Sequence, residues 1–284
     1  MDVSPLGTIA VATDFSEPAS VAVGWAHRLG ALHGARLVLL HVLGGTRERQ
    51  LSPDEAQRGI DGIAATIRSE GLRVEVKLIE GAPGAALGPA SIDLGADLLV
   101  VGSHGHGAIK RLLLGSVAEE VLRTAALPLF VVHPRDGQRP IRFRTALAGV
   151  DFGDASRRAA QLAMRMLDRS PEARLLLLSV TQLPVSFVGP EVPAMPLVEV
   201  SEVTDTAREG VCRLTREFGG HGVAVEGLVC PGAPAEAIID TAEDRRADFV
   251  AVGGVPRSSA ARFLLGSTAM DLVHHAACPV LIAR

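Results

Sequence analysis

The feature that most constrains the fold of this 284-residue chain is that its second half repeats the first. Short strings recur in the same order and at matched spacing: Asp14-Phe15 returns as Asp151-Phe152, Gly81-Ala82-Pro83 as Gly232-Ala233-Pro234, and Leu114-Gly115-Ser116 as Leu265-Gly266-Ser267. Such ordered self-similarity indicates a tandem duplication of one domain. Each half must therefore fold as a similar unit.

Within each half, apolar strand-sized runs alternate with helical patterns. In the first half we expect strands at 9–13, 35–42, 72–79, 97–101 and 128–132, and helices at 19–32, 53–69, 83–94 and 116–124. This alternation predicts an α/β fold with a parallel sheet covered on both faces. Charged residues in 72–79 place that strand at or near an edge.

A polar, turn-rich stretch at 133–142 predicts the boundary between the two halves. We therefore expect domain 1 at 1–135, a linker at 136–141 and domain 2 at 142–284. The halves differ at 181–198, where four prolines exclude a helix or a central strand. That segment is predicted to be a surface loop, either a plain insertion or a lid.

Composition narrows the class of partner. The net charge is -4, the aromatic share is 3% and tyrosine is absent, so we expect no nucleic-acid partner. Apolar runs are strand-sized and the first residues lack a signal-peptide pattern, so we expect no membrane contact and a cytoplasmic location. The three cysteines, Cys212, Cys230 and Cys278, form no CxxC pair and are predicted to be buried small hydrophobes.

The most informative stretch is 98–117, in which a strand run is followed by a glycine-rich loop and a helix start. Gly102 and Gly105 are followed, after nine residues, by Gly115 and Ser116. Glycines let the backbone approach an anion, and a helix start offers unpaired N–H groups at the positive end of the helix dipole. The pattern suits a phosphate, although a plain turn with a helix cap would use the same residues.

With the repeat and an Asp after each first strand, these motifs resemble the universal stress protein family in its tandem form. The family pattern of glycine, two residues, glycine, nine residues, glycine and serine matches Gly102, Gly105, Gly115 and Ser116 without a gap. The resemblance implies two tandem open parallel five-stranded α/β sandwiches. These are Rossmann-like, of the adenine-nucleotide alpha-hydrolase-like type, with the last strands pairing across the domain interface.

The resemblance further implies an ATP site in domain 1. Slow hydrolysis there would need Mg²⁺, held by the phosphates and Asp14, to orient a water. Asp14 and the Val42 backbone would lie near adenine and ribose, Gly102 and Gly105 would lie under the ribose and α-phosphate, and Gly115, Ser116 and Val117 would receive the outer phosphates. The complete implied set is Ala12, Thr13, Asp14, Val42, Gly102, Ser103, Gly105, Gly115, Ser116 and Val117.

Domain 2 departs from this pattern, because Pro256 stands where the second glycine belongs. Proline has no N–H and a fixed φ, so a phosphate donor is lost and we expect weaker ATP binding there or none. The weaker set is Asp151, Val180, Gly253, Gly266, Ser267 and Thr268.

Several site residues also have simpler explanations. Asp14 would organise the turn into the first helix through an Asx hydrogen bond. Lys110 and Arg111 suit either phosphate neutralisation or a solvated loop. His104 and His106 lack a nearby carboxylate or cysteine, so we expect no metal on protein side chains.

Three functions fit the sequence. The first is a stress-response protein that binds ATP and changes its contacts with a protein partner; the family resemblance also implies homodimers. The second is a structural or dimerisation protein in which the loops are relics. The third is an adenylate-using enzyme, against which no HxGH-type motif is found. We predict no catalytic residues and at most slow ATP hydrolysis, because no general base stands beside a nucleophile.

Overall fold

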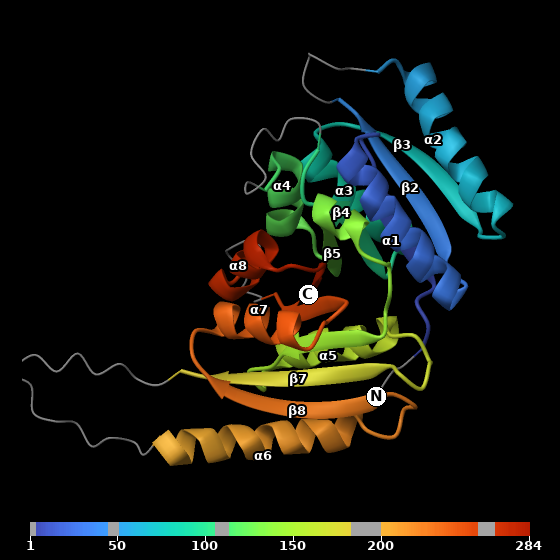
Figure 1. The fold of residues 1–284 in the computed structure, drawn as a ribbon. Coiled ribbons are helices and arrows are strands. Elements are labelled where there is room, and N and C mark those ends of the chain that lie inside the picture. Colours follow the sequence, from blue (N-terminus) through green and yellow to red (C-terminus); the bar gives the residue numbers. More distant parts are fainter. Residues whose placement is uncertain (1–3, 45–50, 106–113, 183–199, 255–264) are drawn as a thin grey trace, which may run out of the picture.

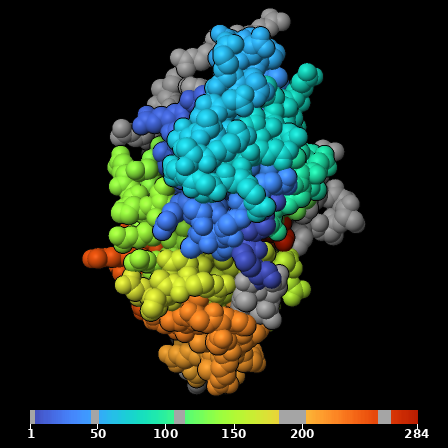
Figure 2. Space-filling model, turned by 90° about the vertical axis from the view of Figure 1, so that its right-hand side faces the viewer, coloured from blue at the N-terminus to red at the C-terminus, as the bar shows by residue number. Residues whose placement is uncertain are grey.

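A computed structural model of the chain describes residues 4–44, 51–105, 114–182, 200–254 and 265–284. The ten strands found in these ranges form one sheet in the order β3-β2-β1-β4-β5-β10-β9-β6-β7-β8. In Figure 1 the first half occupies the upper part of the molecule and the second half the lower part, and Figure 2 shows the same stacking from the side. The expected pair of five-stranded α/β units is confirmed.

The elements follow the same order in both halves. The strands are β1 Thr8–Ala12, β2 Arg36–Leu43, β3 Val74–Glu80, β4 Leu98–Gly102, β5 Leu129–Val132, β6 Thr145–Gly149, β7 Arg174–Thr181, β8 Ala224–Pro231, β9 Phe249–Gly253 and β10 Val280–Ala283. The helices are α1 Glu17–His33, α2 Pro53–Ser69, α3 Pro83–Asp93, α4 Ser116–Thr124, α5 Asp154–Met166, α6 Val200–Phe218, α7 Pro234–Asp244 and α8 Ser267–His275, and η2 Pro134–Gln138 is a 3₁₀ helix.

The two halves are joined through their last strands. β5 pairs with β10 in antiparallel orientation, with Phe130 opposite Leu281, whereas the neighbouring strands within each half are parallel. Pairing of the last strands across the domain interface is thus confirmed. β3 and β8 form the two edges of the sheet, as the charged pattern of β3 predicts.

Helices cover both faces of this sheet. One apolar core lies under α1, α2, α5 and α6, and a second lies under α3, α4, α7 and α8. Successive β1 residues alternate between the two cores, because strand side chains point alternately to opposite faces. The first core runs through the junction, where Trp25 packs on Phe130 and Phe143, and both phenylalanines pack on Phe249.

The linker is more ordered than its polar composition indicates. Residues Pro134–Gln138 form η2, and Asp136 is fully buried. His133, just before η2, donates from Nε2 to the carbonyl of Val273 at 2.7 Å, and Arg284, at the equivalent position after β10, donates to the carbonyl of Leu122. Each half therefore holds the last helix of the other.

The expected burial of all three cysteines is wrong for Cys212. Cys278 is buried and Cys230 is intermediate, but Cys212 is exposed. The reason is helical phase: Val211 and Leu214 of α6 face the sheet, and a residue one position after Val211 is turned about 100° away from it. None of the described helices is both long enough and apolar enough to cross a membrane.

Candidate functional site

The predicted site residues of domain 1 gather at the carboxyl ends of neighbouring strands. β1 lies between β2 and β4, so the segments that follow these three strands leave the sheet at one edge. Ala12 ends β1, Val42 is the second-to-last residue of β2 with 8% exposure, and Gly102 ends β4. In parallel α/β sheets this edge is where ligands bind.

Asp14 is held in place at the start of α1. Its Oδ1 accepts hydrogen bonds from the backbone N–H of Ser16 at 3.0 Å and from the Ser16 hydroxyl at 2.5 Å. The first of these is the Asx hydrogen bond that the sequence allowed. The Ser16 hydroxyl oxygen in turn accepts from the N–H of Ala19 and caps α1. One serine thus fixes both the helix start and the orientation of the carboxylate.

The other oxygen of Asp14 faces the glycine loop. A Cβ placed on Gly105 would lie 2.6 Å from Asp14 Oδ2, so any other residue there would force the loop or the carboxylate to move. The loop is also tied to α4, because the N–H of Gly115 donates to the carbonyl of Ser103 at 2.8 Å. The structure therefore brings Asp14, Gly102, Ser103, Gly105 and Gly115 together, although they are far apart in the sequence.

The start of α4 differs from the starts of α1 and α2. Serine side chains cap α1 and α2, whereas α4 has Gly115 at its N-cap position and no side-chain cap hydrogen bond. Ser116 is therefore the first helical residue and not the cap. Val117 follows with 39% exposure. An uncapped helix start leaves N–H groups that an anion can accept from.

Some predicted features lie outside the described residues. These are Lys110, Arg111 and His106 of the first loop, Pro256 and Arg257 of the second, and most of the proline-rich segment. His104 is described, and its Nδ1 lies 2.7 Å from the hydroxyl oxygen of Ser103. Among the described residues no group of three or more histidine, cysteine, aspartate or glutamate side chains has the arrangement of a metal site.

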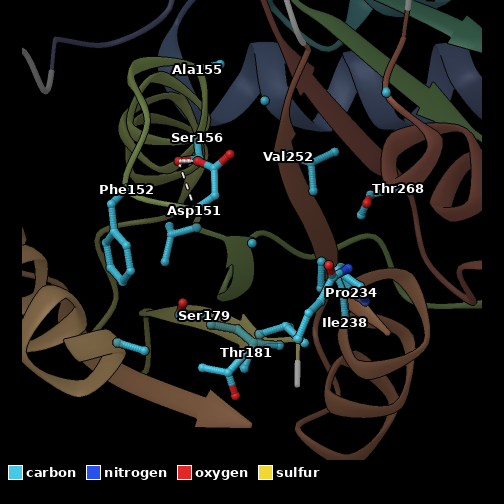
Figure 3. Close-up of a pocket in the computed structure, with 18 of the residues that line it drawn as sticks. Asp151, Phe152, Ala155, Ser156, Ser179, Thr181, Pro234, Ile238, Val252 and Thr268 are labelled. Carbon is cyan, nitrogen blue, oxygen red and sulfur yellow. Dashed lines mark hydrogen bonds between the residues drawn. The ribbon is translucent and has the colours of Figure 1, made fainter. Parts of the chain in front are cut away.

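Domain 2 contains a pocket of about 820 Å³ at the corresponding edge of the sheet. Figure 3 shows Asp151 and Ser156 on one side of it and Thr268 on another. The predicted domain 2 residues Asp151, Val180, Gly253, Gly266, Ser267 and Thr268 all line it. The structure thus assembles the weaker set around one cavity.

Asp151 is oriented by a different serine from the one that serves Asp14. Its Oδ1 accepts from the hydroxyl of Ser156 at 2.5 Å and from the N–H of Gly153 at 3.0 Å. Gly153 stands where domain 1 has Ser16, so the hydroxyl comes instead from the first turn of α5. The sequence indicates Ser16 as part of the helix start, which is confirmed, but sequence reasoning missed the bond from each serine hydroxyl to its aspartate. A serine within five residues after each Asp was a readable signal.

One residue near the end of the second strand differs between the two halves. In domain 1 the ring of His41 packs against Phe15, with ring centroids 4.6 Å apart and planes tilted by 37°, and its Nδ1–H donates to the carbonyl of Thr13. In domain 2 the same position is Ser179, which lines the pocket together with Phe152. A hydroxymethyl group in place of an imidazole leaves space beside the phenylalanine ring.

The electrostatics of the domain 2 pocket are mild. Of the described residues that line it, Asp151 alone carries a formal charge. Hydroxyl and amide groups come from Ser179, Thr181, Gln182 and Thr206, and an apolar wall includes Ile238. α8 begins at this pocket with Gly266 at its N-cap position and no side-chain cap hydrogen bond, as α4 does in domain 1.

A match to one known protein family covers both halves of the chain. The model of the universal stress protein family matches twice, at residues 6–133 and 142–284. This chain belongs to that family. A universal stress protein of Mycobacterium tuberculosis is 30% identical over 303 residues, which cover 99% of this chain and 97% of the relative.

Solved structures of the family share the fold. A universal stress protein from Archaeoglobus fulgidus has a TM-score of 0.71 at 20% identity and covers 98% of both chains. A universal stress protein solved in complex with cAMP is 27% identical to part of this one, covering 46% of this chain and 99% of its own, with a TM-score of 0.39. The cAMP in that structure is bound to the other protein.

Proposed function

We propose that this universal stress protein binds ATP, with Mg²⁺ held on the phosphates, through the glycine loop of domain 1. The observation that carries the proposal is the convergence of Asp14, Gly105 and the uncapped start of α4 at the carboxyl edge of the sheet. The three groups supply a carboxylate, a close backbone approach and free N–H donors. That combination suits a nucleotide with several phosphates.

The residues of this chain have distinct tasks in that proposal. The Ser16 hydroxyl keeps the Asp14 carboxylate oriented before the ligand arrives, which lowers the ordering cost of binding. The N–H groups at the start of α4 and the hydroxyl of Ser116 serve the outer phosphates. Bound ATP would then connect the loop, α4 and α1, and so alter the surface offered to a protein partner. We propose binding and regulation in the cytoplasm, as a homodimer, with hydrolysis at most slow.

The pocket of domain 2 is a second candidate site. Its open volume favours a ligand there, whereas the glycine missing from the sequence of its loop and the mild charge of its described lining disfavour a triphosphate. We therefore keep the ranking in which domain 1 binds ATP more tightly.

Nucleotide analysis tests the proposal directly. Purified protein is denatured, the supernatant is examined by mass spectrometry for ATP, ADP and AMP, and stripped protein is titrated calorimetrically with Mg-ATP. Nucleotide in the supernatant or saturable binding supports the proposal. If no nucleotide is released and none binds, the alternative holds, which is a structural or dimerisation protein of the same fold.

Gly115→Val assigns any binding to domain 1. The Cβ of Gly115 would lie 3.4 Å from the carbonyl oxygen of Ser103, so the backbone accepts a side chain while the valine methyls enter the phosphate path. The matched variant in domain 2 is Gly266→Val. We expect the first to remove most ATP binding and the second little. The reverse result would transfer the main site to domain 2.

A further inference from the structure

A smaller cavity of about 170 Å³ lies where the two halves meet. It is near the amino ends of the strands, whereas the candidate nucleotide sites lie at the carboxyl ends. α1 contributes Arg28 and Leu32, the segment 140–144 forms a second wall, and Asp168 closes the cavity beyond α5. Three of the lining residues are arginines: Arg28, Arg142 and Arg144. With one aspartate, the lining carries a formal excess of positive charge.

The single aspartate is already engaged. Asp168 Oδ1 accepts from the N–H of Ser170 at 3.1 Å and from its hydroxyl at 2.6 Å, while Oδ2 lies 3.4 Å from Nε of Arg144. Arg144 is further anchored by Glu172, 2.5 Å from its Nη1. These contacts fix one side of the cavity.

The other two arginines have no such contacts. Within the described part of the chain, the side chains of Arg28 and Arg142 form neither a hydrogen bond nor an ion pair. Both are exposed at the cavity. Each therefore keeps its donor groups for a ligand.

The repeat supplies an internal comparison. Arg165 stands at the position of Arg28, fourteen residues after the aspartate of its own half, but its Nε donates to the carbonyl of Ser4 at 2.8 Å. The residues just before the first strand of each half, β1 and β6, are held by equivalent hydrogen bonds. Asp97 accepts from the N–H of Gly7, and Asp248 accepts from the N–H of Arg144. By that register Gly7 replaces Arg144 and Pro5 replaces Arg142. The arginine cluster is thus specific to one of two otherwise equivalent positions.

We propose that this cavity binds a phosphoryl-type oxyanion. Guanidinium groups match the paired oxygens of phosphate, a concave basic surface focuses positive potential, and ligand sites favour domain interfaces. The cavity is small, so it accepts one tetrahedral anion and not a whole nucleotide. The proposal is independent of the ATP site.

The test observes the arginines themselves. Protein labelled with ¹⁵N-arginine is titrated with potassium phosphate at constant ionic strength, and the Nε–H resonances are followed by NMR. The Nε–H signals of Arg28 and Arg142 should shift together and saturate. Arg28→Gln and Arg142→Gln should each weaken phosphate binding about tenfold, as expected for the loss of a charged hydrogen bond.

Two further variants test how the charge of the cavity lining changes the affinity for phosphate. Asp168→Asn keeps an acceptor for Ser170 but removes the negative charge, so phosphate should bind more tightly. Arg213→Gln removes one positive charge from the exposed face of α6 and should leave the affinity unchanged. Equal binding by wild type and the double variant R28Q/R142Q, or equal shifts with chloride alone, would overturn the site.

A competition experiment separates two sources of the anion. Glycerol 3-phosphate is added to the phosphate-saturated protein. Displacement of phosphate assigns the site to the phosphoryl group of an organic ligand, and retention assigns it to free phosphate. Both outcomes support an oxyanion site, whereas displacement by acetate at the same concentration would contradict the phosphoryl preference.

Discussion

At the residue scale, a substitution of Gly105 gives the most direct test of the proposed nucleotide site. In Gly105→Ala the new methyl would lie 2.6 Å from Asp14 Oδ2, so either the loop or the carboxylate must move. We expect ATP affinity to fall at least about tenfold, the equivalent of one lost charged hydrogen bond. Calorimetric titration with Mg-ATP measures the change.

Gly62→Ala is the matched control for that substitution. Gly62 lies in α2, and a Cβ there would meet no atom within 4 Å. The variant should be more stable by about 0.5–1 kcal/mol, because alanine loses less backbone entropy in a helix. It should bind ATP like the wild type. Equal affinities of Gly105→Ala and wild type would argue against the contact between loop and carboxylate.

The three cysteines should differ in reactivity. Burial raises the pKa of the Cys278 thiol to about 12 and also raises the pKa of Cys230, whereas Cys212 is exposed on α6. Since only the thiolate reacts, iodoacetamide at pH 8 should modify Cys212 first and Cys278 only after unfolding. Peptide mass spectrometry with time reports the order. Early modification of Cys278 would show that its burial is transient.

At the element scale, the start of α1 combines stability with site geometry. Ser16→Ala removes the N-cap and should lower the free energy of unfolding by about 1 kcal/mol. It also removes a hydroxyl donor from Asp14, so ATP affinity should fall in the same variant. Urea denaturation and Mg-ATP titration measure the two effects.

Ser156→Ala separates these two roles in domain 2. The N-cap of α5 is Gly153, so the substitution removes the hydroxyl that Asp151 accepts from without removing a cap side chain. Its effect on stability should be smaller than that of Ser16→Ala. An equal or larger loss of stability would show that the hydroxyl bonds to Asp151 and to the Gly153 carbonyl matter more than capping.

The elements themselves were largely predictable from the sequence. Apolar runs such as Leu98–Gly102 report burial on both faces of a parallel sheet, and the edge position of β3 followed from its charged residues. The pairing of β5 with β10 was not readable from periodicity and came from the family resemblance. The buried Asp136 was missed because polar residues in a linker normally lie in solvent.

The site was predictable only in part, because contact geometry depends on side chains far apart in the sequence. The glycine spacing indicated which residues surround α4, but the contact of Gly105 with Asp14 appears only when β1 and β4 lie side by side. Likewise, the sequence alone does not show that Ser179 lines a pocket, because this depends on its strand lying beside Phe152. The large pocket of domain 2 could not be inferred from loop motifs.

At the scale of the whole molecule, the junction is both apolar and hydrogen-bonded. His133 holds α8 and Arg284 holds α4, so α4, which the proposed ATP site uses, and its counterpart α8 are each anchored near the carboxyl end by the other half. Burial lowers the pKa of Arg284 to about 10, which still leaves it charged at neutral pH. With β5 and β10 paired between them, the halves share one sheet and the apolar core on each of its faces.

This continuity predicts that the two halves unfold together. Trp25, the single tryptophan, belongs to the first half but contacts Phe143 of the second, so its fluorescence reports on the junction. Phe249→Ala, in the second half, should cost about 3–5 kcal/mol by leaving a cavity beside Phe130 and Phe143. Tryptophan fluorescence and far-UV circular dichroism should shift to lower urea concentration together. If the dichroism changed in two steps, with the fluorescence following only the second, the halves would be independent folding units despite their common sheet.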